Sequence, residues 1–182
     1  MAIRWSVPSL LAIILTATVV LALSSVAARA EISPRDQQAL AKADLIYVAT
    51  VRKNGTQSKA APVWFTTGLD PNSILIQTGP ATWKAKRIRR GSPVMVWIGK
   101  ADGPAFIGQA EITSDAAIQN KILKDYREKY WQNRVMGVGP SRAGFEKGER
   151  IAIKITPVRD LQDSFTSEPG SAPPSMEPSA AK

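Results

Sequence analysis

Residues 45–67 read LIYVATVRKNGTQSKAAPVWFTT, two segments rich in β-branched and aromatic residues that are joined by Asn54-Gly55. An Asn-Gly pair between two such segments is typical of a tight β-hairpin, because both turn positions tolerate a positive φ. We therefore predict antiparallel strands over residues 45–53 and 56–67. Pro62 interrupts the second strand, and a proline there favours an edge, a bulge or the rim of a barrel.

Four further segments have the same strand composition, and turn residues bound each of them. They cover residues 73–78, 94–100, 105–113 and 149–157. A doubly wound parallel fold would need a helix between most of these strands, and the sequence lacks those helices. We therefore predict a mainly β fold, a small β-barrel of six antiparallel strands with helices at its ends.

Three segments have helical composition: residues 34–43, 83–90 and 115–131. Pro34 follows Ser33 at the start of the first segment, which is typical of a helix N-terminus. Ser114 or Asp115 can cap the third segment, whose apolar residues recur at helical spacing. The glycine-bearing segment 132–147 is predicted to be a long loop.

The two ends of the chain differ in composition from its middle. A positive charge near the N-terminus, the uncharged stretch Leu10–Leu23 and the sequence Ala28-Arg29-Ala30 are the parts of a secretory signal peptide, predicted over residues 1–30. Residues 163–182 are rich in serine, proline and alanine, and a disordered tail is predicted there. One domain is then expected over residues 31–162, a length that can bury a core.

The predicted location is periplasmic or secreted, with cleavage after Ala30 and no stable membrane anchor afterwards. The apolar stretch is shorter than the roughly 20 residues that a membrane-spanning helix needs, although a retained N-terminal anchor stays the alternative. No Arg-Arg pair precedes this stretch, so the route that exports prefolded proteins is not indicated.

Cysteine and histidine are both absent from the chain. The lack of cysteine excludes disulfides, a thiolate nucleophile and thiolate-bound metals. The lack of histidine excludes Ser-His-Asp hydrolysis, histidine-ligated zinc and haem held by a proximal histidine. The sequence therefore indicates no catalytic side chain and no metal site, and the reactive atoms of an enzyme of this kind would belong to a bound cofactor.

The chain has a net charge of +9, and five of its 24 lysines and arginines lie close together in residues 78–90, TGPATWKAKRIRR. Gly79-Pro80 end a strand, so the helix that follows would begin at the barrel rim, where free backbone N–H groups favour an anion. Thr78 adds a hydroxyl and Lys84 lies about one turn into the helix, so both can reach one phosphate. The other cations are expected to face solvent: Lys86, Arg89 and Arg90. The alternative is that the whole segment is a solvated basic face.

Other anionic partners can be weighed in the same way. Trp64, Trp83 and Trp97 are scattered over different predicted elements, and no nucleic-acid-binding motif accompanies them, so nucleic acid is not expected as a partner. Electrostatic binding to an anionic membrane or envelope polymer stays open.

The order of these motifs resembles the pyridoxamine 5'-phosphate oxidase-like family of flavin-binding split barrels, in particular its small FMN- or deazaflavin-dependent members. The resemblance spans roughly residues 36–160 and rests on the hairpin, its PVWF strand, the segment SILIQTGPATWKAKRIRRGSPVMVWI and the strand FIGQAEIT. It implies a six-stranded antiparallel split barrel of the FMN-binding type. It also implies a homodimer with a cofactor in each of two grooves between the subunits.

The resemblance further implies six cofactor contacts: Val63, Trp64, Thr78, Lys84, Arg87 and Gln109. Thr78 and Lys84, helped by Arg87, would bind the cofactor phosphate. The backbone of Val63 and Trp64 would lie along the ring system. Gln109 belongs to a strand that often borders the cofactor groove in this family.

Two departures from the family pattern speak against pyridoxamine 5'-phosphate oxidation itself. Ala61 stands where those enzymes carry an arginine, and the C-terminal segment that binds the substrate phosphate through arginine and histidine is missing. The expected function is an exported oxidoreductase that binds FMN or a deazaflavin and transfers a hydride to or from a small substrate. The alternative is a non-catalytic module of the same fold, without this cofactor, that binds another ligand or the cell envelope.

Overall fold

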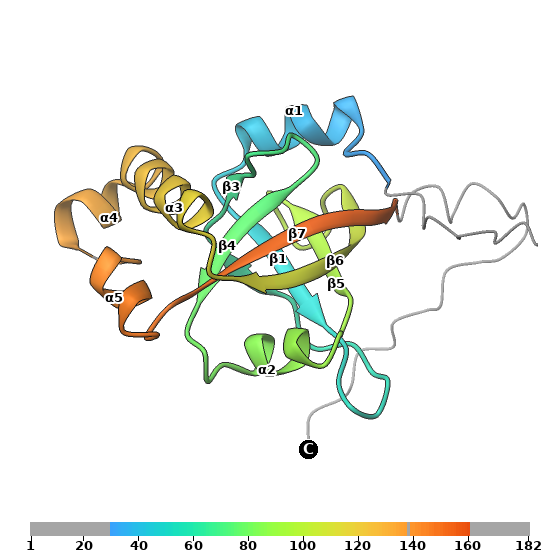
Figure 1. Ribbon diagram of the computed structural model, residues 1–182. Coiled ribbons are helices and arrows are strands. Elements are labelled where there is room, and N and C mark those ends of the chain that lie inside the picture. The colour runs from blue at the N-terminus through green and yellow to red at the C-terminus, as the bar shows by residue number, and fades with distance from the viewer. Residues whose placement is uncertain (1–29, 138, 161–182) are drawn as a thin grey trace, which may run out of the picture.

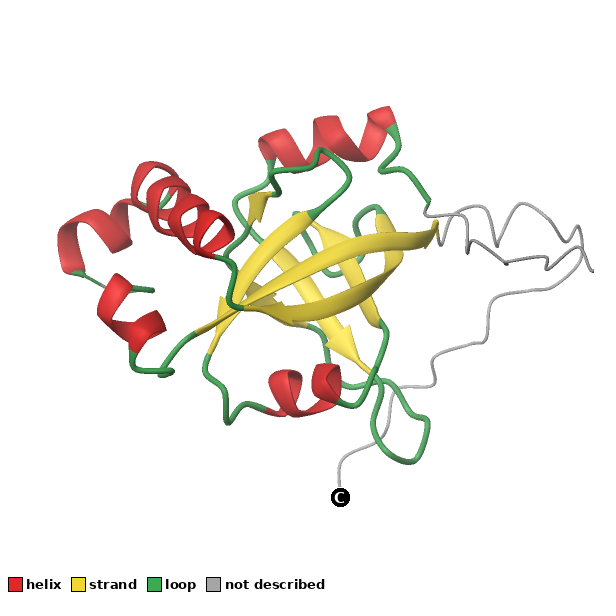
Figure 2. Ribbon diagram, viewed as in Figure 1, coloured by secondary structure: helices red, strands yellow, loops and turns green. Residues whose placement is uncertain are grey.

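The computed structural model describes residues 30–137 and 139–160 (Figures 1 and 2). The predicted signal peptide, apart from Ala30, and the predicted tail over residues 163–182 lie outside the described residues. Within the described ranges, no helix has the length and hydropathy needed to cross a membrane.

Seven antiparallel strands form one sheet that curls into a split barrel, which confirms the predicted mainly β fold (Figure 2). The strands are β1 (Ile46–Thr50), β2 (Ala61–Val63), β3 (Thr66–Thr67), β4 (Ile74–Thr78), β5 (Val94–Ile98), β6 (Ala105–Thr113) and β7 (Ile151–Asp160). Their order across the sheet is β2-β1-β5-β6-β7-β4-β3. The Asn54-Gly55 turn joins β1 to β2 as predicted, with Gly55 at a φ of 80°.

The prediction of six strands was wrong, because the segment 56–67 does not run as one strand. It divides into β2 and β3, which lie at opposite ends of the strand order. Between them, the backbone N–H of Phe65 donates to the Tyr130 hydroxyl at 2.9 Å, and the Tyr126 hydroxyl donates to the carbonyl of Trp64. Tyrosine side chains therefore supply hydrogen bonds that a neighbouring strand would otherwise supply.

Five helices accompany the sheet in the described residues: α1 (Pro34–Lys42), α2 (Trp83–Arg89), α3 (Ala116–Lys129), α4 (Trp131–Met136) and α5 (Arg142–Glu146). The first three confirm the predicted helices, and Asp115 caps α3. The prediction of a long loop over residues 132–147 was wrong, because this segment contains most of α4 and all of α5. Ser141 caps α5 and Phe145 is buried against α3, so tertiary packing stabilises a helix too short to be predicted from its composition.

The apolar core has two parts, which lie on the two faces of β4. Ile74 and Ile76 point into the barrel interior, whereas Leu75 points toward α3. The cluster beneath α3 also contains Ile118, Ile122, Tyr126, Tyr130, Phe145 and Ala152. Burial on both faces explains the nearly continuous apolar sequence of this strand.

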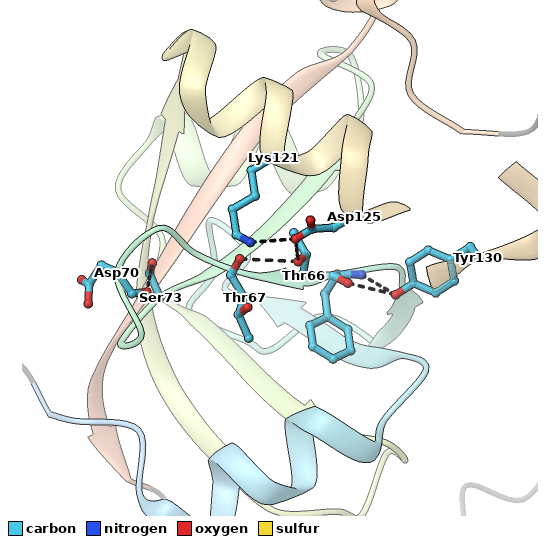
Figure 3. A network of polar contacts seen from close by, with 8 residues as sticks. Thr66, Thr67, Asp70, Ser73, Lys121, Asp125 and Tyr130 are labelled. Carbon is cyan, nitrogen blue, oxygen red and sulfur yellow. Dashed lines mark hydrogen bonds and ion pairs between the residues drawn. The ribbon is translucent and has the colours of Figure 1, made fainter. Parts of the chain in front are cut away.

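Polar contacts fix α3 to β3 (Figure 3). The hydroxyl of Thr66 donates to the carboxylate of Asp125, and Lys121 Nζ lies 2.8 Å from the same oxygen of Asp125. The Trp64 ring stacks on the Tyr130 ring at a centroid distance of 4.5 Å and an interplanar angle of 8°. These contacts, and the hydrogen bonds made by the hydroxyls of Tyr126 and Tyr130, attach α3 to the edge of the sheet at β3.

Gly108→Ala is expected to lower the free energy of unfolding by about 1–2 kcal/mol, because a larger side chain is forced into a packed core. A Cβ atom at Gly108 would lie 2.6 Å from Cγ2 of the fully buried Ile155, so atoms of the core would have to shift. Chemical denaturation followed by circular dichroism measures the effect. Gly79→Ala is the matched control, because a Cβ there meets nothing closer than 3.7 Å. Equal stability of the two variants would contradict this account of the core.

Candidate functional site

The helix α2 closes one end of the barrel, and hydroxyl groups organise its start (Figure 1). The Thr82 hydroxyl donates to the carbonyl of Gly79 at 2.9 Å and accepts the backbone N–H of Ala85 at 3.3 Å. The Thr78 hydroxyl lies 3.2 Å from the Thr82 hydroxyl and donates to it, because the Thr82 proton is already used. The structure thus places Thr78 at the start of α2, and the capping role of Thr82 is one that the sequence analysis missed.

Lys84 lies in the first turn of α2 and is half-buried. Its ammonium group makes no ion pair and no hydrogen bond among the described residues. Burial lowers the pKa of Lys84 from 10.5 to about 8. The chain contains no acidic residue between Asp70 and Asp102, so this part of the sequence supplies no counter-charge. A partly desolvated ammonium group without a partner is a site that an anion would stabilise.

Arg87 links α2 to the sheet. Its guanidinium donates to the Thr50 hydroxyl at 3.1 Å, and its Cζ atom lies 5.8 Å from the centroid of the Trp83 ring. One of its five N–H groups therefore has a partner in the barrel wall, and the others have no hydrogen-bond partner within residues 30–137 and 139–160, so they can meet a second acceptor. Arg87 can assist Lys84, but it also has a structural role that the sequence did not indicate.

The other three predicted contacts lie on different strands or beside them. Val63 is on β2, pairs with Ile46 and packs against the barrel core. Trp64 follows β2, and its ring contacts Tyr126 of α3 and Tyr130 just after α3. Gln109 is exposed on β6. In the described part of the chain no hydrogen bond or ion pair joins these three residues to Lys84. The structure thus brings together Thr78, Lys84 and Arg87 at one end of the barrel.

Gln77 is a further candidate that the sequence analysis missed. Its side-chain oxygen is buried without a hydrogen-bond partner among the described residues. Leaving such an acceptor unsatisfied costs about 1–3 kcal/mol, which a donor group on a ligand would recover. Gln77 is adjacent to Thr78 at the end of β4, and the signal in the sequence is one amide in the apolar strand ILIQT.

A separate groove of about 820 Å³ lies beside α3, between it and the segment that carries α4 and α5. Its charged lining residues are Lys124, Arg127, Glu128 and Arg142. None of the six predicted cofactor contacts lines this groove. In the described ranges no group of three or more acidic side chains is arranged to hold a metal ion.

Comparison with known proteins connects this fold to one family. The family model described as pyridoxamine 5'-phosphate oxidase matches residues 28–161. No curated protein matches the chain.

Among solved structures, similar folds include a conserved hypothetical protein from Mycobacterium tuberculosis, with 18% identity, a TM-score of 0.53, and coverage of 81% of this chain and 96% of that one. A protein from Clostridium acetobutylicum related to general stress protein 26 has 15% identity, a TM-score of 0.50, and coverage of 68% and 81%. The heme storage protein from Vibrio cholerae has 11% identity, a TM-score of 0.50, and coverage of 70% and 91%. One of these proteins is described as a heme storage protein and another as related to a general stress protein, so the shared fold alone does not define what is bound.

Proposed function

The chain belongs to the pyridoxamine 5'-phosphate oxidase family, and from this premise we propose that it is an oxidoreductase that binds FMN or a deazaflavin. The proposed reaction is transfer of a hydride to or from a small substrate. The observation that carries the proposal is Lys84, a half-buried ammonium group that has no ion pair or hydrogen bond among the described residues.

The residues around Lys84 fit a phosphate group. Lys84 supplies the positive charge, Thr78 lies at the adjoining strand end, and Arg87 has N–H groups to spare. Hydrogen bonds between charged groups are about twice as strong as those between neutral groups. A phosphate bound beside Lys84 would therefore be more stable than the same phosphate in water. Gln77 is next to Thr78 in β4 but lies on the face of Leu75, toward α3, so we do not count its side chain among the phosphate contacts.

The protein and the cofactor would have separate tasks. A bound flavin or deazaflavin supplies the hydride chemistry, so the absence of cysteine and histidine does not oppose this function. Lys84 would hold the phosphate end, and the segment Val63-Trp64 would border the ring. The tyrosine contacts hold Trp64 in one orientation, so its backbone offers a fixed edge to a planar ligand.

Two further parts of the proposal concern the assembly and its location. We propose that the active form is a homodimer with a cofactor in each of two grooves between the subunits, because the family resemblance implies this arrangement. We also propose that the protein is exported and that residues 1–30 are removed, because their composition is that of a signal peptide.

The purified protein is expected to bind FMN at one cofactor per chain. Titration of FMN with protein should quench the flavin fluorescence and shift its visible absorption, because the ring leaves water for the groove. A parallel titration with a deazaflavin distinguishes the two cofactors. If neither cofactor binds, the oxidoreductase proposal fails, and the alternative of a non-catalytic module of the same fold is favoured.

A further inference from the structure

The outward face of α2 carries an exposed tryptophan among cations. Trp83, Lys86 and Arg90 are three and four residues apart and therefore lie on one side of the helix, whereas Ala85 and Ile88 are buried. Trp83 is 68% exposed, and Lys86 Nζ lies 5.0 Å from the centroid of its ring. We propose that this end of the barrel is a docking surface for a membrane that contains anionic lipids.

The turn between β1 and β2 adds charge at the same end of the barrel (Figure 1). The Ser92 hydroxyl, just after α2, accepts the backbone N–H of Val51 at 2.9 Å, and Arg87 donates to Thr50. These contacts fix α2 against the strand that leads into the turn. The connection between β1 and β2 contains three exposed cations: Arg52, Lys53 and Lys59.

Charge is distributed unevenly along the chain. Residues 45–101 contain nine lysines and arginines and one acidic residue, Asp70. Asp70 lies in the loop that lines a cavity with residues of α1, at the opposite end of the barrel from α2 (Figure 1). Glu149 is an acidic residue whose backbone lies beside Gly79, on the N-terminal side of α2. Residues 51–60 and 83–90, which hold the turn and α2, together carry eight lysines and arginines and no acidic residue.

Trp83 is a single exposed aromatic side chain on α2, and this favours a lipid surface over nucleic acid as the partner. Tryptophan is enriched at the level of lipid headgroups, and nearby lysines and arginines are attracted to anionic lipids. Proteins that bind single strands present several aromatic side chains along one groove. Here Trp64 is stacked on Tyr130, and Trp131 lies on α4, away from α2 (Figure 1).

The test is sedimentation of the protein with phosphatidylcholine vesicles, with or without phosphatidylglycerol. Binding is expected only with phosphatidylglycerol, together with a blue shift of tryptophan emission, and it should be lost at high salt. Lys86→Glu with Arg90→Glu should weaken binding at least tenfold, because each cation near an anionic surface contributes about fivefold. Trp83→Ala should abolish most of the emission shift. All of these measurements use the chain that begins at residue 31, the form proposed after removal of residues 1–30, because the uncharged stretch Leu10–Leu23 can itself bind lipid.

Matched controls separate this surface from general charge. Lys124→Glu with Arg127→Glu makes the same change in charge at exposed positions of α3, and Trp131→Ala removes another exposed tryptophan. Both controls should retain binding to phosphatidylglycerol. Equal weakening by the two double variants, or tighter binding to a single-stranded oligonucleotide than to the vesicles, would overturn the proposal. The proposal would also be overturned if a second copy of the chain already covered Trp83 in solution.

Discussion

Replacement of Lys84 by methionine is expected to weaken FMN binding about 10- to 100-fold, because a hydrogen bond between an ammonium group and a phosphate contributes roughly 1.5–3 kcal/mol. The same change should stabilise the ligand-free protein. Burial lowers the pKa of Lys84 to about 8, which means that the folded state disfavours its charge. Methionine has a similar length and no charge to desolvate, so a gain of roughly 1–2 kcal/mol is expected after allowance for partial solvent exposure.

These opposite effects distinguish a ligand-binding lysine from a structural one. Titration of FMN fluorescence gives the affinity, and urea denaturation gives the stability of the ligand-free protein. Lys86→Met is the control, because Lys86 is exposed on the outward face of α2 and should leave both quantities nearly unchanged. A Lys84→Met variant that binds FMN as tightly as the original chain would exclude the assigned role.

The pKa of Lys84 also predicts a dependence on pH. Below pH 8 both the folded and the unfolded states carry the proton, and the full cost of burying the charge is present. Between pH 8 and 10.5 the unfolded chain holds more protons, so the stability of the original protein should rise relative to Lys84→Met. FMN affinity should fall over the same range, because the free protein loses the charge that binds phosphate. Parallel curves for the two proteins from pH 7 to 10.5 would contradict this interpretation.

Tyr130→Phe is expected to lower the free energy of unfolding by about 2–3 kcal/mol, because it leaves buried backbone groups without partners. The Tyr130 hydroxyl accepts the N–H of Phe65 at 2.9 Å and lies 2.8 Å from the carbonyl of Asp44 and 3.0 Å from that of Phe65. The Tyr130 hydroxyl has one proton, so it can donate to only one of these two carbonyls at a time. Urea denaturation followed by circular dichroism measures the loss.

Tyr47→Phe is the control for this substitution. Tyr47 is half-buried on β1, and its hydroxyl makes no hydrogen bond among the described residues, so the same chemical change should cost little. If the two variants were equally stable, the tyrosine hydroxyl would not be what holds the break between β2 and β3.

The pKa of Tyr130 gives a second measurement of the same contact. Burial is the main cause that raises this pKa from 10.0 to about 12. The folded state then holds the proton where the unfolded state has lost it, so this contribution is complete below pH 10 and is lost as the pH rises to about 12. Tyr130→Phe should remove this contribution, so the free energy of unfolding of the variant should fall less steeply between pH 10 and about 12.

The sequence by itself was sufficient for the elements that depend on neighbouring residues. The Asn54-Gly55 turn, the helix α2 and the helix capped by Asp115 all follow from local backbone preferences, and each is present in the structure. The charge of residues 78–90 was also evident from the sequence. These features need no information about distant parts of the chain.

Tertiary structure decided the features that depend on distant residues. The break in the second predicted strand rests on Tyr126 and Tyr130, which lie 62 and 65 residues away from the carbonyl and N–H groups that they bind. The helix α5 is too short to be stable without the packing of Phe145 against α3. The amino-acid composition of a segment does not indicate which distant residues it will contact in the folded protein.

The candidate site shows the same division. The sequence determined that Lys84 stands near the start of a basic helix, but it could not show which of the neighbouring cations loses its water. Packing of α2 against the barrel leaves Lys86 and Arg90 exposed and half-buries Lys84. Charge is a property of the residue, whereas desolvation depends on every atom packed around it, so only the folded chain distinguishes the proposed phosphate ligand from the surface cations beside it.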